Sequence, residues 1–242
     1  MDSLNRIAIL VDGDNAQARL LKAILEEVSK YGKVTIRRIY GDWTTPHMTS
    51  WKAALNDLSF TPIQKFSYTT GKNSTDSSLI IDAMDFLHDK IVDGFAIVSS
   101  DSDYTGLAKR IREEGIFVMG IGEKKTPSAF IQSCEIFTYC ENILPEIPKE
   151  IPPEKPVHGK AKKTTAAPAY LDKINKAYEM SVSEGSETYI SQVGLNLRKI
   201  DPSFDPRAYG FKTITQLFES LKKYEVIKNE VNGLNHPLVK KK

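Results

Sequence analysis

The sequence predicts a three-layer α/β domain with a parallel sheet, followed by a small winged-helix domain. Apolar, strand-like runs alternate with amphipathic helical patterns from residue 6 to residue 139. Such alternation is typical of parallel strands joined by right-handed helical crossovers. The last part of the chain instead shows three helical patterns followed by a hairpin signal. We therefore expect a first domain over 1–144, a linker over 145–168 and a second domain over 169–242.

Each element of the first domain follows from its apolar pattern. Buried strands are expected at six short apolar runs, which cover residues 6–11, 34–40, 60–65, 95–99, 116–121 and 136–139. Helices are expected where apolar residues recur at spacings of three and four, which occurs over residues 16–31, 47–58, 76–91, 104–114 and 127–132. The order of these elements predicts a doubly wound sheet with helices on both faces.

The remaining chain divides into a linker and a compact helical pattern. Residues 145–168 are rich in proline and lysine, a composition that favours an extended linker without a core of its own. Helices are expected over 169–183, 189–198 and 213–224. Strand-like residues then flank Asn232-Gly233, a strong signal for a two-residue hairpin. Three helices followed by a hairpin predict a winged helix.

Charge and composition bound the partners and the location. The net charge of +2 combines 16 Lys and Arg against 19 Asp and Glu in residues 1–145 with 17 against 12 in residues 146–242. The basic second part suits a nucleic acid. No apolar run approaches 18 residues and no secretory signal is evident, so we expect no membrane partner. Cys134 and Cys140 are expected as idle thiols in a reducing cytoplasm.

Acidic residues occur where the predicted strands end and the predicted helices begin. Asp12 and Asp101 directly follow buried strands, and Asp76 opens a helix. Open α/β folds bind ligands at the carboxyl ends of their strands. Carboxylates that converge there repel one another unless a divalent cation is shared between them. The pattern therefore indicates a Mg²⁺- or Mn²⁺-dependent reaction on phosphate esters.

Structural uses of the same acids stay open. Asp76, Asp101 and Asp103 precede predicted helices, where a carboxylate commonly caps free backbone N–H groups. Capping explains each acid singly, but it does not explain why two of them follow strands that should be neighbours. A later set with spacing i, i+3, i+7 predicts a solvent-exposed stripe on one helix: Asp82, Asp85 and Asp89.

Three ordered motifs resemble the signatures of NYN domains, in their LabA-like branch, which belong to the PIN-like nuclease group. The motifs are Val-Asp-Gly-Asp-Asn at 11–15, Lys-Asn-Ser-Thr-Asp at 72–76 with Ile-Asp-Ala-Met-Asp at 81–85, and Ser-Ser-Asp-Ser-Asp-Tyr at 99–104. The second part is similar to the OST-HTH, or LOTUS, winged helix, through Tyr-Gly-Phe-Lys-Thr-Ile at 209–214 and Leu-Phe-Glu-Ser-Leu at 217–221.

The resemblance implies a PIN-like, Rossmann-like fold and a metal-dependent endoribonuclease joined to an RNA-binding module. It implies a catalytic Mg²⁺ or Mn²⁺ site formed by Asp12, Asp76, Asp101 and Asp103. Beside it we expect Asn15 as a polar neighbour, with Ser99 and Ser100 orienting the acids or metal-bound water. Lys72, Asn73 and Lys212 are the candidate RNA contacts, although for Lys72 and Asn73 a plain loop role is equally open.

Two other functions are compatible with these residues. A non-catalytic RNA-binding adaptor would keep the acids for folding or for a structural ion. A phosphatase of the haloacid dehalogenase type would use Asp12 of Asp12-Gly13-Asp14 as its nucleophile, but it gives no role to Asp76. The sequence also leaves open a homodimer, and a protein or DNA partner for the winged helix.

Overall fold

The computed structural model describes residues 4–66, 74–143, 170–182, 187–231 and 233–242. The predicted linker and both of its boundaries fall outside these ranges, so the boundaries stay predictions. The chain divides into two compact units. The first comprises Met1–Leu144 with Asp201–Tyr209, and the second comprises Pro145–Ile200 with Gly210–Lys242.

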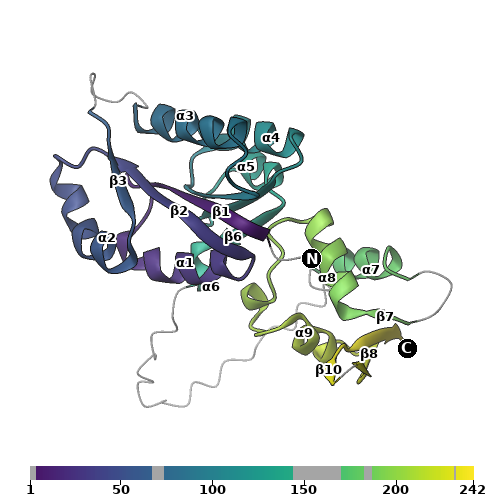
Figure 1. Ribbon diagram of the computed structural model, residues 1–242. Coiled ribbons are helices and arrows are strands. Elements are labelled where there is room, and N and C mark those ends of the chain that lie inside the picture. Colours follow the sequence, from purple (N-terminus) through teal and green to yellow (C-terminus); the bar gives the residue numbers. More distant parts are fainter. Residues whose placement is uncertain (1–3, 67–73, 144–169, 183–186, 232) are drawn as a thin grey trace, which may run out of the picture. The chain divides into compact units, whose positions relative to one another are not determined.

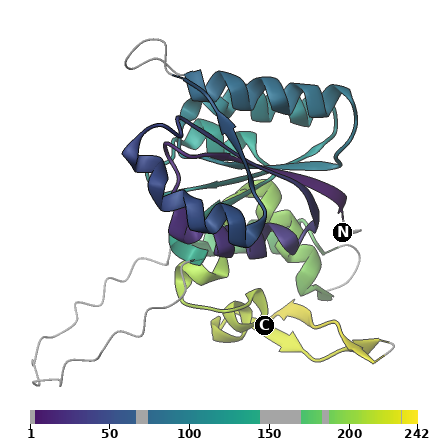
Figure 2. The same ribbon diagram turned by 60° about the vertical axis from the view of Figure 1, so that its left-hand side comes forward.

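The first unit is built on a six-stranded, fully parallel sheet with the order β3-β2-β1-β4-β5-β6. Its strands are β1 (Leu4–Asp12), β2 (Gly32–Gly41), β3 (Thr61–Gln64), β4 (Gly94–Val98), β5 (Phe117–Gly122) and β6 (Ile136–Tyr139). The parallel sheet confirms the predicted fold class (Figures 1 and 2). Because β1 pairs with β4, with Val11 opposite Val98, the two strands that precede Asp12 and Asp101 are neighbours, as expected.

Helices cover both faces of this sheet (Figure 1). One layer contains α1 (Leu21–Ser29), α2 (Lys52–Leu58) and α6 (Cys140–Ile143), and the other contains α3 (Ser74–His88), α4 (Thr105–Glu113) and α5 (Ser128–Ser133). Short 3₁₀ helices are η1 (Ala18–Leu20), η2 (Pro46–Trp51), η3 (Ser102–Tyr104) and η4 (Pro206–Tyr209). Helix α6 was not predicted, because four residues are too few to show a helical period.

The central strand β1 separates two hydrophobic clusters. Ile7, Ile9 and Val11 belong to the cluster that includes α1, whereas Ala8 and Leu10 belong to the cluster that includes α3 and α4. All five side chains are fully buried. A strand buried on both faces reads as a continuous apolar run, which is why its position could be predicted from the sequence.

A glycine shapes the turn that follows β1. The backbone N–H of Gly13 donates to the carbonyl oxygen of Tyr40 on β2 at 2.8 Å. A Cβ atom at Gly13 would lie 2.8 Å from that oxygen and 2.7 Å from the Cε atom of Met48. Because any larger residue would collide with the neighbouring strand, glycine is needed between the two acids Asp12 and Asp14.

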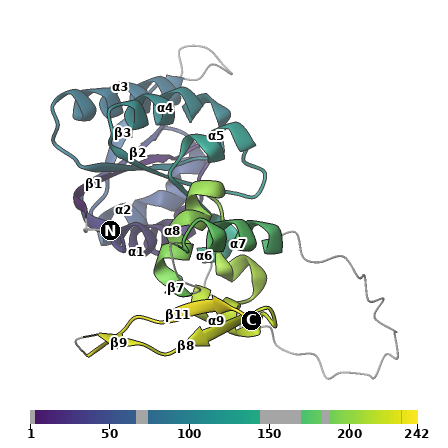
Figure 3. The same ribbon diagram turned by 90° about the vertical axis from the view of Figure 1, so that its right-hand side faces the viewer.

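The second unit has the helices and hairpin of a winged helix (Figure 3). Its elements are α7 (Tyr170–Glu179), β7 (Glu187–Tyr189), α8 (Ile190–Ile200), α9 (Ile214–Ser220), β8 (Tyr224–Ile227), β9 (Glu230–Val231), β10 (Leu234–Asn235) and β11 (Leu238–Lys241). An antiparallel sheet of order β7-β11-β8 packs beside a helical core. Helix α9 begins after Thr213, whose hydroxyl accepts a hydrogen bond from the N–H of Gln216.

The prediction that Tyr189 starts a helix was wrong. Tyr189 lies in β7 opposite Leu238 of β11, and α8 begins one residue later. The three residues of β7 form a strand because they pair with β11, which also pairs with β8. This pairing depends on the tertiary structure, so the local periodicity of the sequence does not reveal it. Among the described residues, no helix has both the length and the apolar character required to cross a bilayer.

Candidate active site

Three carboxylates from two segments of the chain meet at the carboxyl edge of the first unit's sheet. Asp76 lies in the first turn of α3, Asp101 follows β4 and Asp103 lies in η3. Each offers a carboxylate oxygen, and these atoms lie within 4.8 Å of one another. Asp76 is only 9% exposed, whereas Asp103 is exposed to solvent.

Asp12, the fourth predicted acid, occupies a different position. It is fully buried at the end of β1. Its Oδ2 accepts hydrogen bonds from Nδ2 of Asn15 and Oγ of Ser99, both at 2.8 Å, and its Oδ1 accepts one from the N–H of Asp14 at 3.2 Å. Among the described residues, Asp12 does not belong to the group of acids whose oxygens all lie within 4.8 Å. Asp12 is therefore a buried hydrogen-bond acceptor that holds Asn15 and Ser99 in place, and we call it the anchor.

Ser99 connects this anchor to the acidic cluster. While its hydroxyl donates to Asp12, its Oγ accepts a hydrogen bond from the backbone N–H of Asp101 at 3.0 Å. Asp101 in turn caps η3, because its Oδ1 accepts from the N–H of Asp103 at 2.9 Å. Asp101 can therefore cap η3 and also belong to the acidic cluster, because the cap uses only one of its two carboxylate oxygens.

Burial and mutual repulsion raise the pKa of two of these acids. Burial is the main cause of the raised pKa of Asp76, and the charges of Asp12, Asp101 and Asp103 raise it further, against a hydrogen bond from Tyr104. Burial also raises the pKa of Asp12, while the hydrogen bonds from Asn15 and Ser99 lower it. The metal-free site therefore holds its negative charge at a cost in folding free energy.

The carboxylate cluster suits a hard divalent cation. Mg²⁺ and Mn²⁺ prefer oxygen ligands, and Mg²⁺ usually combines one or two carboxylates with retained water. The partial exposure of the cluster fits retained water, since Asp103 faces solvent. The three carboxylate oxygens of Asp76, Asp101 and Asp103 thus form a donor set that fits the metal predicted from the sequence.

A tyrosine missing from the predicted site contacts the cluster directly. The hydroxyl of Tyr104 donates to Oδ1 of Asp76 at 2.6 Å. Its ring is fully buried and packs against Phe130, with ring centroids 6.4 Å apart. In the sequence, Tyr104 follows Asp103 directly and simply marks the start of a helix. Its partner belongs to another helix, so its role could not be predicted.

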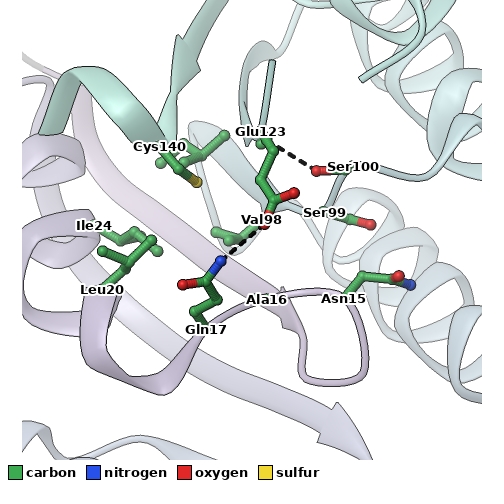
Figure 4. A pocket seen from close by; sticks show the side chains of 12 residues that line it. Asn15, Ala16, Gln17, Leu20, Ile24, Val98, Ser99, Ser100, Glu123 and Cys140 are labelled. Atoms are coloured by element: carbon green, nitrogen blue, oxygen red, sulfur yellow. Dashed lines mark hydrogen bonds between the residues drawn. The ribbon is translucent and has the colours of Figure 1, made fainter. Parts of the chain in front are cut away.

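A small pocket is lined by Ser99, by Ser100 and by a further acid, Glu123. Glu123 follows β5 at the same edge of the sheet and accepts a hydrogen bond from Nε2 of Gln17 at 2.9 Å, while its N–H donates to Oγ of Ser100 at 2.9 Å (Figure 4). The pocket has a volume of about 10 Å³, which is room for about one water molecule. Asn15 and Ser99 point to the same side, away from its apolar end (Figure 4). Ser100 thus orients the loop of Glu123, an acid that the sequence analysis did not select.

Lys72, Asn73 and Lys212 are the remaining residues that the sequence predicts to contact RNA. Lys72 and Asn73 lie outside the described residues. Lys212 is exposed in the second unit, where its backbone N–H donates to the side chain of Gln216. The predicted RNA contacts therefore stay predictions.

Asp85 and Asp89 of the predicted stripe are exposed, but Asp82 is only partly exposed and faces β2. Its Oδ2 accepts a hydrogen bond from the hydroxyl of Tyr40 at 2.8 Å and forms an ion pair with Arg38. The reason is that α3 packs against β2, whose Tyr40 and Arg38 side chains reach Asp82. Helical spacing alone does not show which polar residue a neighbouring strand will meet.

Family models match both parts of the chain. A model of the NYN domain matches residues 6–144, and a model of the OST-HTH/LOTUS domain matches residues 170–236. The chain belongs to the NYN domain family. The two matches confirm both predicted resemblances and their order, although they do not test the LabA-like branch. Together they support a nuclease-like, RNA-binding role for this NYN protein.

A search of curated sequences gives no match. A similar solved structure is that of a protein of unknown function from Vibrio parahaemolyticus, with 21% sequence identity and a TM-score of 0.49. The similarity covers 57% of the present chain and 94% of that chain.

Proposed function

We propose that this NYN protein is a metal-dependent endoribonuclease that hydrolyses RNA phosphodiesters and binds RNA through its winged helix. One observation carries the proposal. Asp76 comes from α3 and Asp101 and Asp103 come from the segment after β4, yet all three present carboxylate oxygens within 4.8 Å of one another at the ligand-binding edge of an NYN domain.

Each polar residue then has a distinct task. Asp76, Asp101 and Asp103 would hold Mg²⁺ or Mn²⁺, which supplies Lewis-acid polarisation of a phosphoryl oxygen and a water of lowered pKa. Asp12 holds Ser99 in place, and Ser99 fixes the backbone that leads to Asp101. Asn15 secures the same buried carboxylate from the turn after β1.

A haloacid dehalogenase-type phosphatase fits this geometry less well. Its nucleophile would be Asp12, which must reach the substrate phosphorus. Asp12 is fully buried, and both of its oxygens accept hydrogen bonds from the protein. That chemistry also leaves Asp76 without a role, although Asp76 belongs to the acidic cluster.

The test measures cleavage of labelled single-stranded RNA by the full chain with Mn²⁺, Mg²⁺ or EDTA, beside hydrolysis of a small phosphate ester. We expect metal-dependent RNA cleavage that Asp101→Asn lowers by at least about 100-fold, given that even the loss of an outer-shell partner costs 10- to 100-fold. The asparagine keeps an oxygen that can accept from the N–H of Asp103, so the fold should persist.

Asp57→Asn is a matched control, because it removes an exposed carboxylate from α2. Full cleavage by Asp101→Asn would assign the activity to another site or to a contaminant. RNA binding without cleavage by the wild-type protein would favour the adaptor. Ester hydrolysis without RNA cleavage would favour the phosphatase.

A further inference from the structure

We infer that Tyr104 is a positioning residue, whose buried hydroxyl holds the carboxylate of Asp76 in the acidic cluster ready for the cation. The inference rests on the proposed function, because it assigns Asp76 to the metal. The hydrogen bond joins two helices, since Asp76 lies in the first turn of α3 and Tyr104 directly precedes α4.

The ring of Tyr104 is fixed by its surroundings. It is fully buried in the hydrophobic cluster that also contains Leu79 of α3, Leu107 of α4 and Phe130 of α5. The ring and Phe130 have centroids 6.4 Å apart. A side chain packed from three helices cannot easily change rotamer. Its hydroxyl is therefore a donor of fixed position, 2.6 Å from Oδ1 of Asp76.

Asp76 needs such a donor because its neighbours repel it. The carboxylates of Asp101 and Asp103 lie within 4.8 Å of one of its oxygens. Without a cation, that repulsion favours any rotamer that turns Asp76 away from the cluster. A donor on Oδ1 opposes the rotation, so the carboxylate is already oriented when a cation arrives. Such outer-shell hydrogen bonds typically orient metal ligands.

Tyr40 of β2 provides a matched comparison, because its hydroxyl also donates to an aspartate of α3. It is also fully buried, and its hydroxyl donates to Asp82, six residues after Asp76 on α3, at 2.8 Å. Asp82 keeps a second partner in Arg38 and lies outside the acidic cluster. A Tyr→Phe change at either position removes one buried hydroxyl and keeps the ring. Only the change at Tyr104 should alter the affinity for metal.

The experiment compares Mn²⁺ binding to the full-length wild-type, Tyr104→Phe and Tyr40→Phe proteins, by calorimetry and by the electron paramagnetic resonance of free Mn²⁺. We expect the dissociation constant to rise about 10-fold in Tyr104→Phe, within the range for lost outer-shell partners, and to stay unchanged in Tyr40→Phe. In RNA cleavage, Tyr104→Phe should need more Mn²⁺ for half-maximal rate, while the rate at saturating Mn²⁺ stays close to that of the wild type.

The outcomes separate this inference from the proposed function. Equal Mn²⁺ affinity in the wild type and Tyr104→Phe would overturn the role of Tyr104 and leave the nuclease intact. Equal weakening in both variants would also overturn it, because a general loosening of α3 would suffice. Weaker binding in Tyr104→Phe alone, with no RNA cleavage by the wild type, would support Tyr104 and overturn the nuclease. A wild type that binds no Mn²⁺ would overturn both.

Discussion

Replacing Asp76 with asparagine should stabilise the metal-free protein while weakening its response to metal. The change removes one charge from the acidic cluster and keeps an oxygen that can accept the hydrogen bond of Tyr104. It also removes the cost of burying a charge at a side chain that is only 9% exposed. Both effects act in the same direction.

The geometry of the cluster gives the size of the effect. Two unit charges 4.8 Å apart repel by about 0.9 kcal/mol at the dielectric constant of water. Relief of repulsion from Asp101 and Asp103 together should therefore raise the free energy of unfolding by about 2 kcal/mol, and relief of the repulsion from Asp12 adds to this. For a domain of this size that corresponds to a rise in Tm of about 4–8 °C.

The effect should depend on pH with a definite sign. The pKa of Asp76 in the folded protein is raised above its ordinary value of 3.8. Because this pKa is raised, the contribution of protonated Asp76 to the free energy of unfolding is fully present below pH 3.8. It is lost as the pH rises through the pKa that Asp76 has in the folded protein. The stability difference between Asp76→Asn and the wild type should therefore be small in acid and reach its full size at neutral pH.

Thermal unfolding in EDTA and then in Mn²⁺ tests this reasoning. Mn²⁺ at about 100 times its dissociation constant should stabilise the wild type by about 2.7 kcal/mol and Asp76→Asn by clearly less. Asp82→Asn is the control of opposite sign, because it weakens the ion pair with Arg38 and should lower Tm. The reasoning fails if Asp76→Asn lowers Tm in EDTA at neutral pH, or if Mn²⁺ stabilises both proteins equally.

Two further predictions concern the turn after β1 and the winged helix. Gly13→Ala should lower the free energy of unfolding by about 1–3 kcal/mol, because its Cβ atom would lie 2.8 Å from the carbonyl oxygen of Tyr40. Gly106→Ala, which meets no atom within 4 Å, should not destabilise, and urea unfolding compares the two. Lys212→Ala should weaken binding of single-stranded RNA and reduce the slope of log affinity against log salt by about 0.7, if Lys212 contacts a phosphate. Lys240→Ala is the control, because Lys240 is paired with Glu225, and equal slopes in titrations of both variants would remove Lys212 from the interface.

The sequence alone determined the parts of this protein that depend on local patterns. A strand buried on both faces must be apolar along its length, so β1 and β4 could be located from the sequence, and so could the acids that follow them. The strand order of a doubly wound sheet then makes these two strands neighbours and brings Asp12 and Asp101 to one edge. The antiparallel pairing of Val231 in β9 with Leu234 in β10 was likewise predicted from the turn residues between them in the sequence.

Only the tertiary structure decided what each polar side chain contacts. The sequence treats Asp12 and Asp76 alike, yet the first is a fully buried anchor for Ser99 and Asn15, and the second joins Asp101 and Asp103. The donor to Asp76, Tyr104, is 28 positions away along the chain. A hydrogen bond forms wherever packing places a donor within about 3 Å of an acceptor. That placement depends on how α3 and α4 pack on the sheet, which no local pattern of residues encodes.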